Sequence, residues 1–562
     1  MALFTMEQVS FTYAGAATKA LEGIDLTIDQ GDFAVLAGTT GSGKTTLLRL
    51  LKNQVRPEGT LSGVLHYEGI PLTQVDDRRS VEEIGMVFQD PDNQLVTHTV
   101  WQELFFGLEN LGYSPEMMQR RVGEVVNYFG IGEYLHQPVH ALSGGQKQIV
   151  NLAAVMALRP RILLLDEPTA QLDPVASREF LGMLYRLHRE MGITIIISEH
   201  RLEGLVPMAH KMLVLDQGRI RFQGGVRKVM QAVWEAGDQR FMGFIPETGQ
   251  LYLQLASSEK EEEIPVTVQE GQRWFQGFFQ SACGELSTGR GPLSVQKDLQ
   301  ADDAPMQEEN LAVRCQDLFF RYEKNGPLIL NRLSLALPKG HFFVLLGGNG
   351  SGKTTLLRIL AGIRKPQRGK IFYQGVKQPS FRGTVGYLAQ NPLAYLSEET
   401  VEELFRERIR EMKGTNPEKM FRDIIHDYEL EEMLRQHPFD LSGGEQQKIA
   451  LSLVLMSDPE LVLLDEPTKG LDRDARHRLG MKINEMKQQG KTILMASHDV
   501  EFAARYADKC GMIFDGKIHG TGETRSFFSD NCFYTTTIHR VVGQQLKNAV
   551  TLKDVIQSCS RQ

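Results

Sequence analysis

The chain has 562 residues, 41% of them hydrophobic and 23% charged, which is ordinary for a globular protein of roughly three or four domains. Its net charge of −8 gives no electrostatic reason to expect tight binding to nucleic acid. Five scattered cysteines without a C-x-x-C pair argue against a zinc or iron–sulfur cluster and favour reduced thiols in a reducing compartment.

Short apolar runs predict strands and helices in alternation. Phe33–Ala37 predicts a buried strand that enters a glycine-rich loop, and Thr45–Leu51 predicts the helix after that loop. Ile162–Leu165 and Thr194–Ile197 predict two further buried strands. The second half repeats the pattern as Phe342–Leu346, Thr354–Leu360, Leu461–Leu464 and Thr492–Met495. Such alternation is typical of a mostly parallel α/β sheet in each half.

No segment resembles a secretory signal or a membrane helix. Residues 1–10 lack a basic start followed by an apolar run. Apolar stretches such as 342–346 are far shorter than the ~20 residues that a membrane helix needs. We therefore expect any membrane role to be played from the membrane surface.

Residues 243–310 differ in composition from both halves. They contain twelve acidic and four basic residues, so their net charge is 4 − 12 = −8. Their one strongly apolar cluster is Trp274–Phe279. We interpret the segment as an acidic linker with a small strand-rich attachment that packs on the first domain. The aromatic cluster is interpreted as structural packing, with a docking patch for a partner as the alternative.

The most informative feature is an internal repeat. TGSGKTTLLRL at Thr40–Leu50 returns as NGSGKTTLLRI at Asn349–Ile359. ILLLDEPTAQLD at Ile162–Asp173 returns as LVLLDEPTKGLD at Leu461–Asp472, with a third repeated motif between these two. The repeat indicates a duplicated unit. We expect one domain over 1–242, the linker over 243–310, a second domain over 311–540 and a tail over 541–562.

Both copies contain the phosphate-binding pattern G-x-x-x-x-G-K-[ST]. Glycines let the backbone wrap around phosphates, and N–H groups at a helix start offer positive potential. The lysine neutralises phosphate charge, and the threonine hydroxyl ligates Mg²⁺. The residues expected to bind here are Gly38, Thr39, Thr40, Gly41, Ser42, Gly43, Lys44, Thr45 and Thr46, with Gly347, Gly348, Asn349, Gly350, Ser351, Gly352, Lys353, Thr354 and Thr355.

An acidic pair ends an apolar run in each copy, as Asp166-Glu167 and Asp465-Glu466. Such a strand delivers its carboxylates to the C-terminal edge of the sheet, where the phosphates are expected. The aspartate suits a water-mediated contact with Mg²⁺, and the glutamate suits polarisation of the attacking water as a general base. Solvated acids at a strand end are the structural alternative, which the neighbouring motifs disfavour.

A serine and two glycines precede a predicted helix in each copy, within LSGGQ and LSGGE. Their hydroxyl and backbone N–H groups form a second anion cradle, which a single phosphate loop needs only if another copy of the domain supplies it. With these motifs, residues 4–225 and 311–535 resemble the ABC ATPase family. In that family this cradle is called the signature motif. Its residues here are Ser143, Gly144, Gly145 and Gln146, and Ser442, Gly443, Gly444 and Glu445.

The resemblance implies the fold and the way in which the halves combine. Each domain would have an α/β core of the P-loop NTPase type, an antiparallel β subdomain and a helical signature subdomain. The domains of this family close head to tail, so each ATP lies between one phosphate loop and the signature of the other domain. One site would use Lys44, Asp166, Glu167 and Ser442–Gly444, and the other Lys353, Asp465, Glu466 and Ser143–Gly145. A homodimer is then not required.

Four further positions of the family pattern can be placed in each half. They are an aromatic residue that stacks on adenine, a glutamine that reaches Mg²⁺ and the attacking water, an aspartate in the loop between the sites, and a histidine at the γ-phosphate. In the first half they are Tyr13, Gln89, Asp173 and His200, and in the second half Tyr322, Gln390, Asp472 and His498. Base stacking contributes ~1–3 kcal/mol and tolerates any base.

Both sites keep every part of the pattern, so we expect two hydrolysis-competent sites that use ATP and Mg²⁺. The expected catalytic residues are Glu167, His200 and Gln89, with Glu466, His498 and Gln390. The expected metal-binding residues are Thr45, Gln89 and Asp166, with Thr354, Gln390 and Asp465.

The region after each glutamine is where such ATPases meet a membrane partner. Gln89–Val96 and Thr99–Gly107 are similar to the ATPases of energy-coupling factor (ECF) and cobalt-type importers, and Gln390–Phe405 is a divergent version. The tail Phe527–Thr537 also resembles tandem ECF ATPases, including those for thiamine-precursor import. The resemblance implies integral membrane partners, an ECF T-type component and a substrate-binding subunit, with this chain peripheral at the cytoplasmic face of the cell membrane.

Other tandem ABC proteins fit the sequence less well. Those that act on the ribosome, as translation factors, resemble each other in a long basic connector, whereas 243–310 is acidic, which opposes RNA binding. Tandem sugar-importer ATPases tend to have one degraded phosphate loop, and neither loop is degraded here. DNA-repair ABC proteins need long coiled-coil or zinc insertions that this sequence lacks. We expect no nucleic-acid partner.

Overall fold

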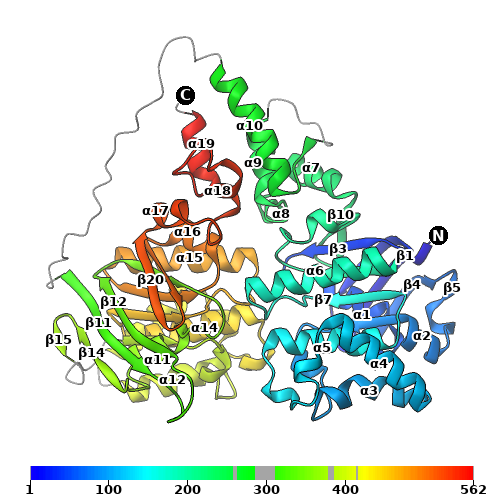
Figure 1. The fold of residues 1–562 in the computed structure, drawn as a ribbon, viewed down its shortest axis with the longest axis horizontal. Helices are drawn as coiled ribbons and strands as arrows, with labels where there is room; N and C mark the ends of the chain where they lie inside the picture. Colours follow the sequence, from blue (N-terminus) through cyan, green and yellow to red (C-terminus); the bar gives the residue numbers. More distant parts are fainter. Residues whose placement is uncertain (1, 257–262, 285–309, 378–384, 413–415, 561–562) are drawn as a thin grey trace. The chain divides into compact units, whose positions relative to one another are not determined.

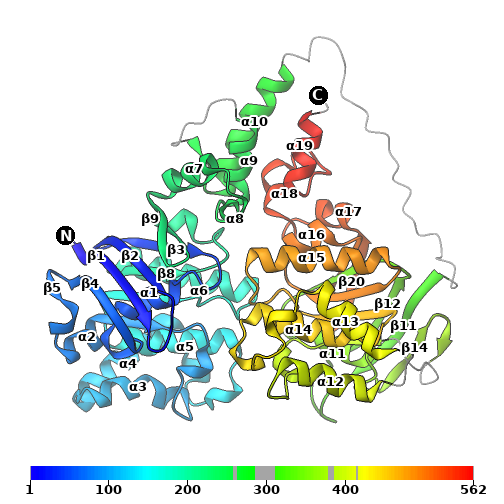
Figure 2. The same cartoon turned by 180° about the vertical axis from the view of Figure 1, so that it is seen from behind.

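The same pair of sheets occurs twice along the chain, once in each of two units that cover Met1–Gly271 and Gln272–Gln562 (Figures 1 and 2). Each pair consists of a four-stranded antiparallel sheet and a six-stranded, mostly parallel sheet. The computed structural model describes residues 2–256, 263–284, 310–377, 385–412 and 416–560.

The small sheet of the first unit is antiparallel. Its strand order is β2 (Leu21–Asp29), β1 (Ala2–Tyr13), β4 (Gly59–Tyr67) and β5 (Ile70–Pro71). Buried and exposed residues alternate along β2, because one face of such a sheet packs on the core and the other meets solvent.

The large sheet of the first unit carries the phosphate loop. Its strand order is β10 (Arg219–Gly224), β9 (Lys211–Asp216), β3 (Phe33–Gly38), β8 (Thr194–Ser198), β7 (Ile162–Asp166) and β6 (Ile84–Val87). All pairings are parallel except that of β9 with β10. Every residue of β3, β7 and β8 is buried, which explains why these strands are continuous apolar runs.

The helices of the first unit include a separate helical group. α3 (Val100–Asn110), α4 (Pro115–Phe129) and α5 (Gly144–Ala157) pack together in both views (Figures 1 and 2). The signature motif starts α5. The remaining helices are α1 (Lys44–Leu50), α2 (Asp77–Glu83), α6 (Pro174–Met191), α7 (Val226–Ala236), α8 (Gln239–Met242) and α9 (Glu247–Leu255). The division between the units, after Gly271, falls within α10 (Val268–Gly284).

The second unit repeats both sheets. The small sheet has the order β12 (Leu330–Pro338), β11 (Leu311–Phe320), β14 (Arg368–Tyr373) and β15 (Val376–Lys377). The large sheet has the order β16 (Val385–Leu388), β17 (Leu461–Asp465), β18 (Thr492–Ser497), β13 (Phe342–Leu346), β19 (Lys509–Phe514) and β20 (Lys517–Glu523). Only β19 and β20 pair antiparallel in the large sheet.

The helices of the second unit follow the same plan. α12 (Val401–Glu411), α13 (Pro417–Asp427) and α14 (Gly443–Leu455) form its helical group, and the second signature motif starts α14. The remaining helices are α11 (Lys353–Leu360), α15 (Arg473–Gln488), α16 (Val500–Tyr506), α17 (Thr524–Asp530), α18 (Thr537–Val542) and α19 (Leu552–Ser560).

The predicted fold class is confirmed. Each strand and helix that the apolar runs predict is present, with its ends within one or two residues of the prediction. Both units have the α/β core, the antiparallel sheet and the helical group that the resemblance implies.

The expected strand-rich attachment between the halves is wrong for the residues that the structure describes. The described parts of 243–310 contain α9 and α10 and no strand. The aromatic residues of Trp274–Phe279 recur at helical spacing on α10, and Phe275 is fully buried. Arg227 of α7 donates a hydrogen bond to Glu270 of α10 (2.9 Å), which ties the segment to α7. The rest of the acidic segment lies outside the described residues.

Candidate functional site

The phosphate loop of the first unit connects the end of β3 to the start of α1. Gly43 caps α1 with φ +102°, and a Cβ there would lie 2.8 Å from the Ala20 oxygen, so the position requires glycine. The buried Lys44 donates hydrogen bonds to the backbone oxygens of Gly38 (2.9 Å) and Thr39 (3.0 Å). The loop therefore holds its cation against its own backbone.

The phosphate loop of the second unit has nearly the same geometry. Gly352 caps α11 with φ +104°, and a Cβ there would lie 2.9 Å from the Ile329 oxygen. The buried Lys353 donates to the backbone oxygens of Gly347 (2.8 Å) and Gly348 (3.0 Å). The two loops thus differ by no more than 0.1 Å in these lysine contacts.

Asp166 ends β7 beside the phosphate loop of the first unit. Its Oδ1 accepts hydrogen bonds from the hydroxyls of Thr45 (3.1 Å) and Ser198 (2.8 Å). Burial raises the pKa of the Asp166 carboxyl, and the two hydrogen bonds oppose that change. The structure thus brings together Asp166 and Thr45, two of the predicted metal-binding residues, and both present the oxygen atoms that Mg²⁺ prefers.

Asp465 holds the corresponding place at the end of β17. Its Oδ1 accepts from the Thr354 hydroxyl (2.9 Å), and its Oδ2 accepts from the Tyr387 hydroxyl (3.2 Å). Burial raises the pKa of Asp465, with these hydrogen bonds again opposing. The second partner of the aspartate is therefore a serine on β8 in the first unit and a tyrosine on β16 in the second.

Glu167 is the residue around which the predicted catalytic set of the first unit gathers. Its backbone is left-handed (φ +43°), an uncommon state for a side-chain-bearing residue that costs ~1–3 kcal/mol. Its Oε1 lies 2.9 Å from His200 Nε2 and 3.9 Å from Lys44 Nζ. Its Oε2 accepts a hydrogen bond from Gln89 Nε2 at 3.0 Å. Gln89, Glu167 and His200 are thus within contact distance, although they are far apart in sequence.

Glu466 in the second unit has the same backbone conformation (φ +50°) but different neighbours. Its Oε2 lies 2.8 Å from His498 Nδ1, and its Oε1 lies 3.3 Å from Lys353 Nζ. Burial alone raises the pKa of Glu466, but the contacts with His498 and Lys353 outweigh burial and leave the pKa lowered. Within the described residues, no hydrogen bond joins Gln390 to Glu466, whereas Gln89 does donate to Glu167.

The predicted adenine-stacking tyrosines are anchored by their hydroxyl groups. The Tyr13 hydroxyl hydrogen-bonds the Thr46 hydroxyl (2.8 Å), and the Tyr322 hydroxyl hydrogen-bonds that of Thr355 (3.0 Å). Both tyrosine side chains are nevertheless exposed to solvent, by 37% and 51%. Each ring is therefore held beside its phosphate loop and remains accessible to a stacked base.

The signature serines cap their helices. Ser143 Oγ accepts from the Gln146 N–H (3.3 Å), and Gln146 Oε1 accepts from the Ser143 N–H (2.9 Å), which is a capping box. Ser442 and Glu445 form the same box at α14. Both serines are exposed. Asp173 and Asp472 also cap helices, α6 and α15.

The residues present fit phosphates with Mg²⁺. Ser42 Oγ and Ser351 Oγ are buried in the loops and have no hydrogen-bond partner among the described residues. A buried hydroxyl without a partner is costly, and a phosphate oxygen would supply one. The lysine, the threonine hydroxyl and the strand-end carboxylate complete the set of groups that phosphate and Mg²⁺ require.

Several residues of the site escaped sequence analysis. Ser198 and Tyr387 bind the strand-end aspartates, and Glu199 lies buried behind Glu167. Ser198 and Glu199 directly precede His200, and their polar side chains at the end of an apolar strand were the available signal. Tyr387 gave no signal, because it reads as one more apolar residue of a buried strand.

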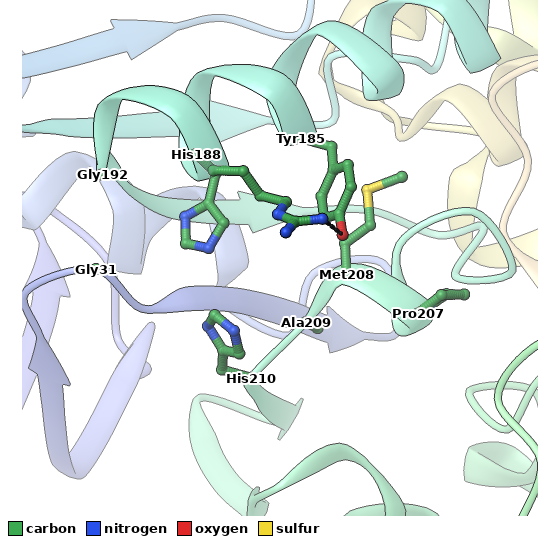
Figure 3. Close-up of a pocket in the computed structure, with 9 residues that line it drawn as sticks. Gly31, Tyr185, His188, Gly192, Pro207, Met208, Ala209 and His210 are labelled. Carbon is green, nitrogen blue, oxygen red and sulfur yellow. Dashed lines mark hydrogen bonds between the residues drawn. The ribbon is translucent and has the colours of Figure 1, made fainter.

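A pocket of about 420 Å³ lies at the opposite end of β3 from the phosphate loop. Figure 3 shows His188 and His210 side by side there, with their ring centroids 5.2 Å apart. His210 Nδ1 accepts from the Phe33 N–H (3.2 Å), and His188 Nδ1 lies 2.9 Å from the Ile193 oxygen. The pocket is at the end of the sheet where β3 begins, so it is separate from the nucleotide site.

The fold and the two loops define a tandem P-loop ATPase. The family model described as "ABC transporter" matches residues 21–170 and 330–469. A Bacillus cereus protein, named as an ABC transporter ATP-binding protein, is 42% identical over 559 residues, covering 99% of this chain and 97% of that protein. The chain therefore belongs to the ABC transporter family, as an ATP-binding protein with two ABC domains, and it is an ATPase that uses ATP with Mg²⁺.

Two solved structures are also similar to this chain. The cbiO1 protein of Clostridium perfringens, part of the ABC transporter complex cbiONQ, is 31% identical and covers 43% of this chain and 98% of its own, with a TM-score of 0.38. An archaeal ribosome recycling factor, solved with a ribosomal stalk protein, is 20% identical with a TM-score of 0.57, covering 93% of this chain and 91% of its own. At 20% identity, the second likeness shows a shared fold only.

Proposed function

We propose that this chain is the ATP-hydrolysing subunit of an ECF-type importer. The observation that carries the proposal is three exposed apolar side chains in the segment after Gln89 and in α3, which we call the docking surface. Val96, Trp101 and Phe106 are 63%, 38% and 43% exposed there. Large apolar side chains that stay exposed are candidates for a contact with another protein, and a surface beside a nucleotide-sensing loop suits a helix of a membrane subunit.

The corresponding region of the second unit contains a pocket of about 280 Å³. Its lining includes Tyr387, Tyr395, Leu404, Glu407 and Arg408. This lining is more charged than the aromatic surface of the first unit. The difference supports a membrane partner that offers two unlike docking helices, one to each unit. In the part of the chain that the structure describes, no helix is long and apolar enough to cross a membrane.

We assign the chemistry of the first unit to Glu167 as general base. A carboxylate that contacts three polar side chains is held in one orientation, so it can take the proton of the attacking water without searching for its position. Gln89 and His200 position the water and the γ-phosphate, and Lys44 balances phosphate charge. Thr45 and Asp166 would hold Mg²⁺, which would supply positive charge against the phosphates when bound.

The second unit repeats these roles with Lys353, Thr354, Asp465, Glu466, His498 and Gln390, although no hydrogen bond joins Gln390 to Glu466 among the described residues. We further propose that each phosphate loop is completed by the signature of the other half. The exposed serines at the starts of α5 and α14 support this, because a capped, exposed helix start offers N–H groups to an anion.

The partners of this proposal are an ECF T-type membrane component and a substrate-binding membrane subunit, which places the chain peripherally at the cytoplasmic face. The separate subunit would select the solute, a vitamin, a vitamin precursor or a metal ion. No nucleic-acid partner is proposed, since the net charge is −8.

Affinity purification of the chain from its own membranes tests the proposal. We expect a small integral membrane protein to co-purify with the intact chain. The double substitution Trp101→Ala with Phe106→Ala should reduce recovery of that protein. Phe533→Ala is the matched control, because Phe533 is 86% exposed but lies outside the docking surface. Co-sedimentation with ribosomes, without any membrane partner, would contradict the importer and favour a translation factor.

A further inference from the structure

The two units differ at one residue immediately before the predicted γ-phosphate histidine. Thr194 and His200 are six residues apart, as are Thr492 and His498 (200 − 194 = 498 − 492 = 6). Glu199 therefore occupies in the first unit the position that Ser497 occupies in the second. Both side chains are buried, at 3% and 0% exposed. The difference places a long carboxyl group in one site and a short hydroxyl in the other.

Glu199 binds the turn that follows Glu167. Its Oε1 accepts the Thr169 N–H at 2.8 Å and the Thr169 hydroxyl at 2.7 Å. The turn itself is closed by the Ala170 N–H, which donates to the Glu167 oxygen at 3.1 Å. One carboxyl oxygen of Glu199 thus accepts two hydrogen bonds that fix Thr169, the residue two positions after Glu167.

The second unit has no equivalent of this contact among its described residues. Thr468, the counterpart of Thr169, is 1% exposed, and its Oγ1 is buried without a hydrogen-bond partner. Ser497 Oγ instead accepts the N–H of Asp499 at 3.0 Å, within its own segment. The turn after Glu466 is therefore held by fewer hydrogen bonds than the turn after Glu167.

The position of Glu199 connects it to the chemistry without placing it on the nucleotide. Its neighbour Ser198 accepts the Glu167 N–H through its backbone oxygen (3.1 Å), and its other neighbour, His200, contacts the Glu167 carboxylate. Burial and the nearby Glu167 charge raise the pKa of Glu199 to about 7, with His200 and the Thr169 hydrogen bonds opposing. Burying a carboxyl group costs folding free energy, and the hydrogen bonds that Glu199 makes to Thr169 offset this cost.

We infer that Glu199 is a positioning residue of the first ATP site: it fixes the turn Glu167–Thr169 and so restricts the movement of Glu167. The second site lacks this support, so the two sites hydrolyse ATP at different rates, the first being the faster. The inference rests on the role proposed for Glu167.

The test compares Glu199→Ser, which copies the second unit, with Glu199→Gln, which keeps an acceptor oxygen of the same reach. Single-turnover hydrolysis, with the chain in excess over ATP, is measured in a Glu466→Gln background so that the first site is observed. We expect Glu199→Ser to lower the rate constant about tenfold with unchanged ATP affinity, since a misplaced reacting group costs rate rather than binding. Glu199→Gln should stay within about twofold of its parent.

A second background and a second readout separate this role from a merely structural one. In a Glu167→Gln background, Glu199→Ser should leave the remaining rate unchanged, and Ser497→Ala is the matched control of the second unit. Hydrogen–deuterium exchange should become faster in peptides covering 166–173 and stay constant in peptides covering 465–472. Equal rate losses in both backgrounds, or unchanged exchange at 166–173, would overturn the inference.

Failure of the proposed role of Glu167 gives a different result. Wild-type rates in both the Glu167→Gln and the Glu466→Gln chains would remove that role, whatever Glu199 does. The exchange measurement still decides whether Glu199 holds the turn, because it does not depend on hydrolysis.

Discussion

The two units agree where phosphates are expected and differ in how the glutamate proposed as general base is held. The lysine contacts with the loop backbone match within 0.1 Å. The lysine–glutamate distance, by contrast, is 3.9 Å in the first unit and 3.3 Å in the second. The histidine presents Nε2 to Glu167 but Nδ1 to Glu466. The two phosphate loops therefore share one geometry, whereas the two glutamates proposed as general bases have different supporting contacts.

The charges near the two glutamates also differ. Glu199, a second carboxyl group, lies close enough to Glu167 for their charges to interact. In the second unit Lys469 interacts with the charge of Glu466, and Ala170 stands at the corresponding position of the first unit. A lysine favours the ionised glutamate, whereas a carboxyl group disfavours it. The first site thus relies on hydrogen bonds for positioning, and the second relies on opposite charge.

The largest expected effect comes from removing the glutamates. Glu167→Gln combined with Glu466→Gln should lower steady-state ATPase activity by about 10²–10⁴-fold, the usual contribution of a general base. Because we infer the faster site in the first unit, Glu167→Gln alone should cost more activity than Glu466→Gln alone. Equilibrium ATP binding, which the isosteric amide preserves, is the control. A larger loss for Glu466→Gln than for Glu167→Gln would contradict the inference that the first site is the faster one.

The next largest effect is the pH dependence of stability that Glu199 contributes in the first unit. Burial raises the pKa of Glu199 from the ordinary 4.5 to about 7, so the folded chain binds this proton more tightly than the unfolded chain. The stabilisation is present below about pH 4.5 and is lost as the pH rises to about 7, a change on the order of 3 kcal/mol. Glu199→Gln should remove that slope.

Urea unfolding between pH 5 and 8 measures this slope. Tryptophan fluorescence suits the measurement, because Trp101 and Trp234 both lie in the first unit. Ser497→Ala, which alters the position corresponding to Glu199, is the control and should keep the slope. A slope that persists in Glu199→Gln would assign it to another group.

Sequence reasoning reached the fold and part of the site for a physical reason. Fully buried parallel strands are continuous apolar runs, so β3 and β7 could be predicted from the sequence alone. The loop and acidic motifs lie at the ends of those runs, which is why Lys44 and Glu167 could be placed at one sheet edge.

The parts that sequence could not supply depend on long-range contacts and on side-chain direction. Glu199 meets Thr169 only because β7 and β8 are neighbours, and the two residues are 30 positions apart (199 − 169 = 30). Each glutamine follows a corresponding strand, β6 or β16, yet among the described residues only Gln89 hydrogen-bonds its glutamate. The prediction of a strand-rich segment between the halves was wrong because the aromatic residues of Trp274–Phe279 recur at helical spacing, and they lie on α10.

A smaller effect should separate the two signature helices. Ser143→Ala and Ser442→Ala each remove a helix cap and should cost about 1 kcal/mol of unfolding free energy. The cost should be larger at Ser442, because its hydroxyl also donates to the Glu445 carboxylate at 2.6 Å and hydrogen bonds to charged groups are the stronger ones. Urea unfolding measures both, and amide exchange in the first turns of α5 and α14 locates the loss. Equal costs would show that the charge of Glu445 adds nothing.

The smallest effect concerns the far ends of the two large sheets. Lys487 corresponds to His188, because each lies the same number of residues after the end of its strand, β17 or β7. Asp508 corresponds in the same way to His210, counted from the starts of β18 and β8. Asp508 Oδ1 accepts from Lys487 at 2.8 Å, and its Oδ2 accepts the N–H of the first residue of β13 at 2.9 Å. His210 Nδ1 accepts the corresponding N–H of β3. The ring nitrogen of His210 therefore takes the place that a carboxylate oxygen of Asp508 has in the second unit.

Replacing both histidines by the pair from the second unit, His188→Lys with His210→Asp, should therefore keep the backbone hydrogen bond and add an ion pair. Since Lys487 and Asp508 are each more than a quarter exposed, the coupling in a double-mutant cycle should be only about 0.2–1 kcal/mol. Solvent-exposed pairs are screened by salt, so this coupling should shrink between 0.05 and 0.5 M salt, roughly as the Debye length falls. Urea unfolding of the two single variants and the double variant at both salt concentrations measures it. A coupling of zero at low salt would mean that the ion pair of the second unit depends on surroundings that the first unit does not share.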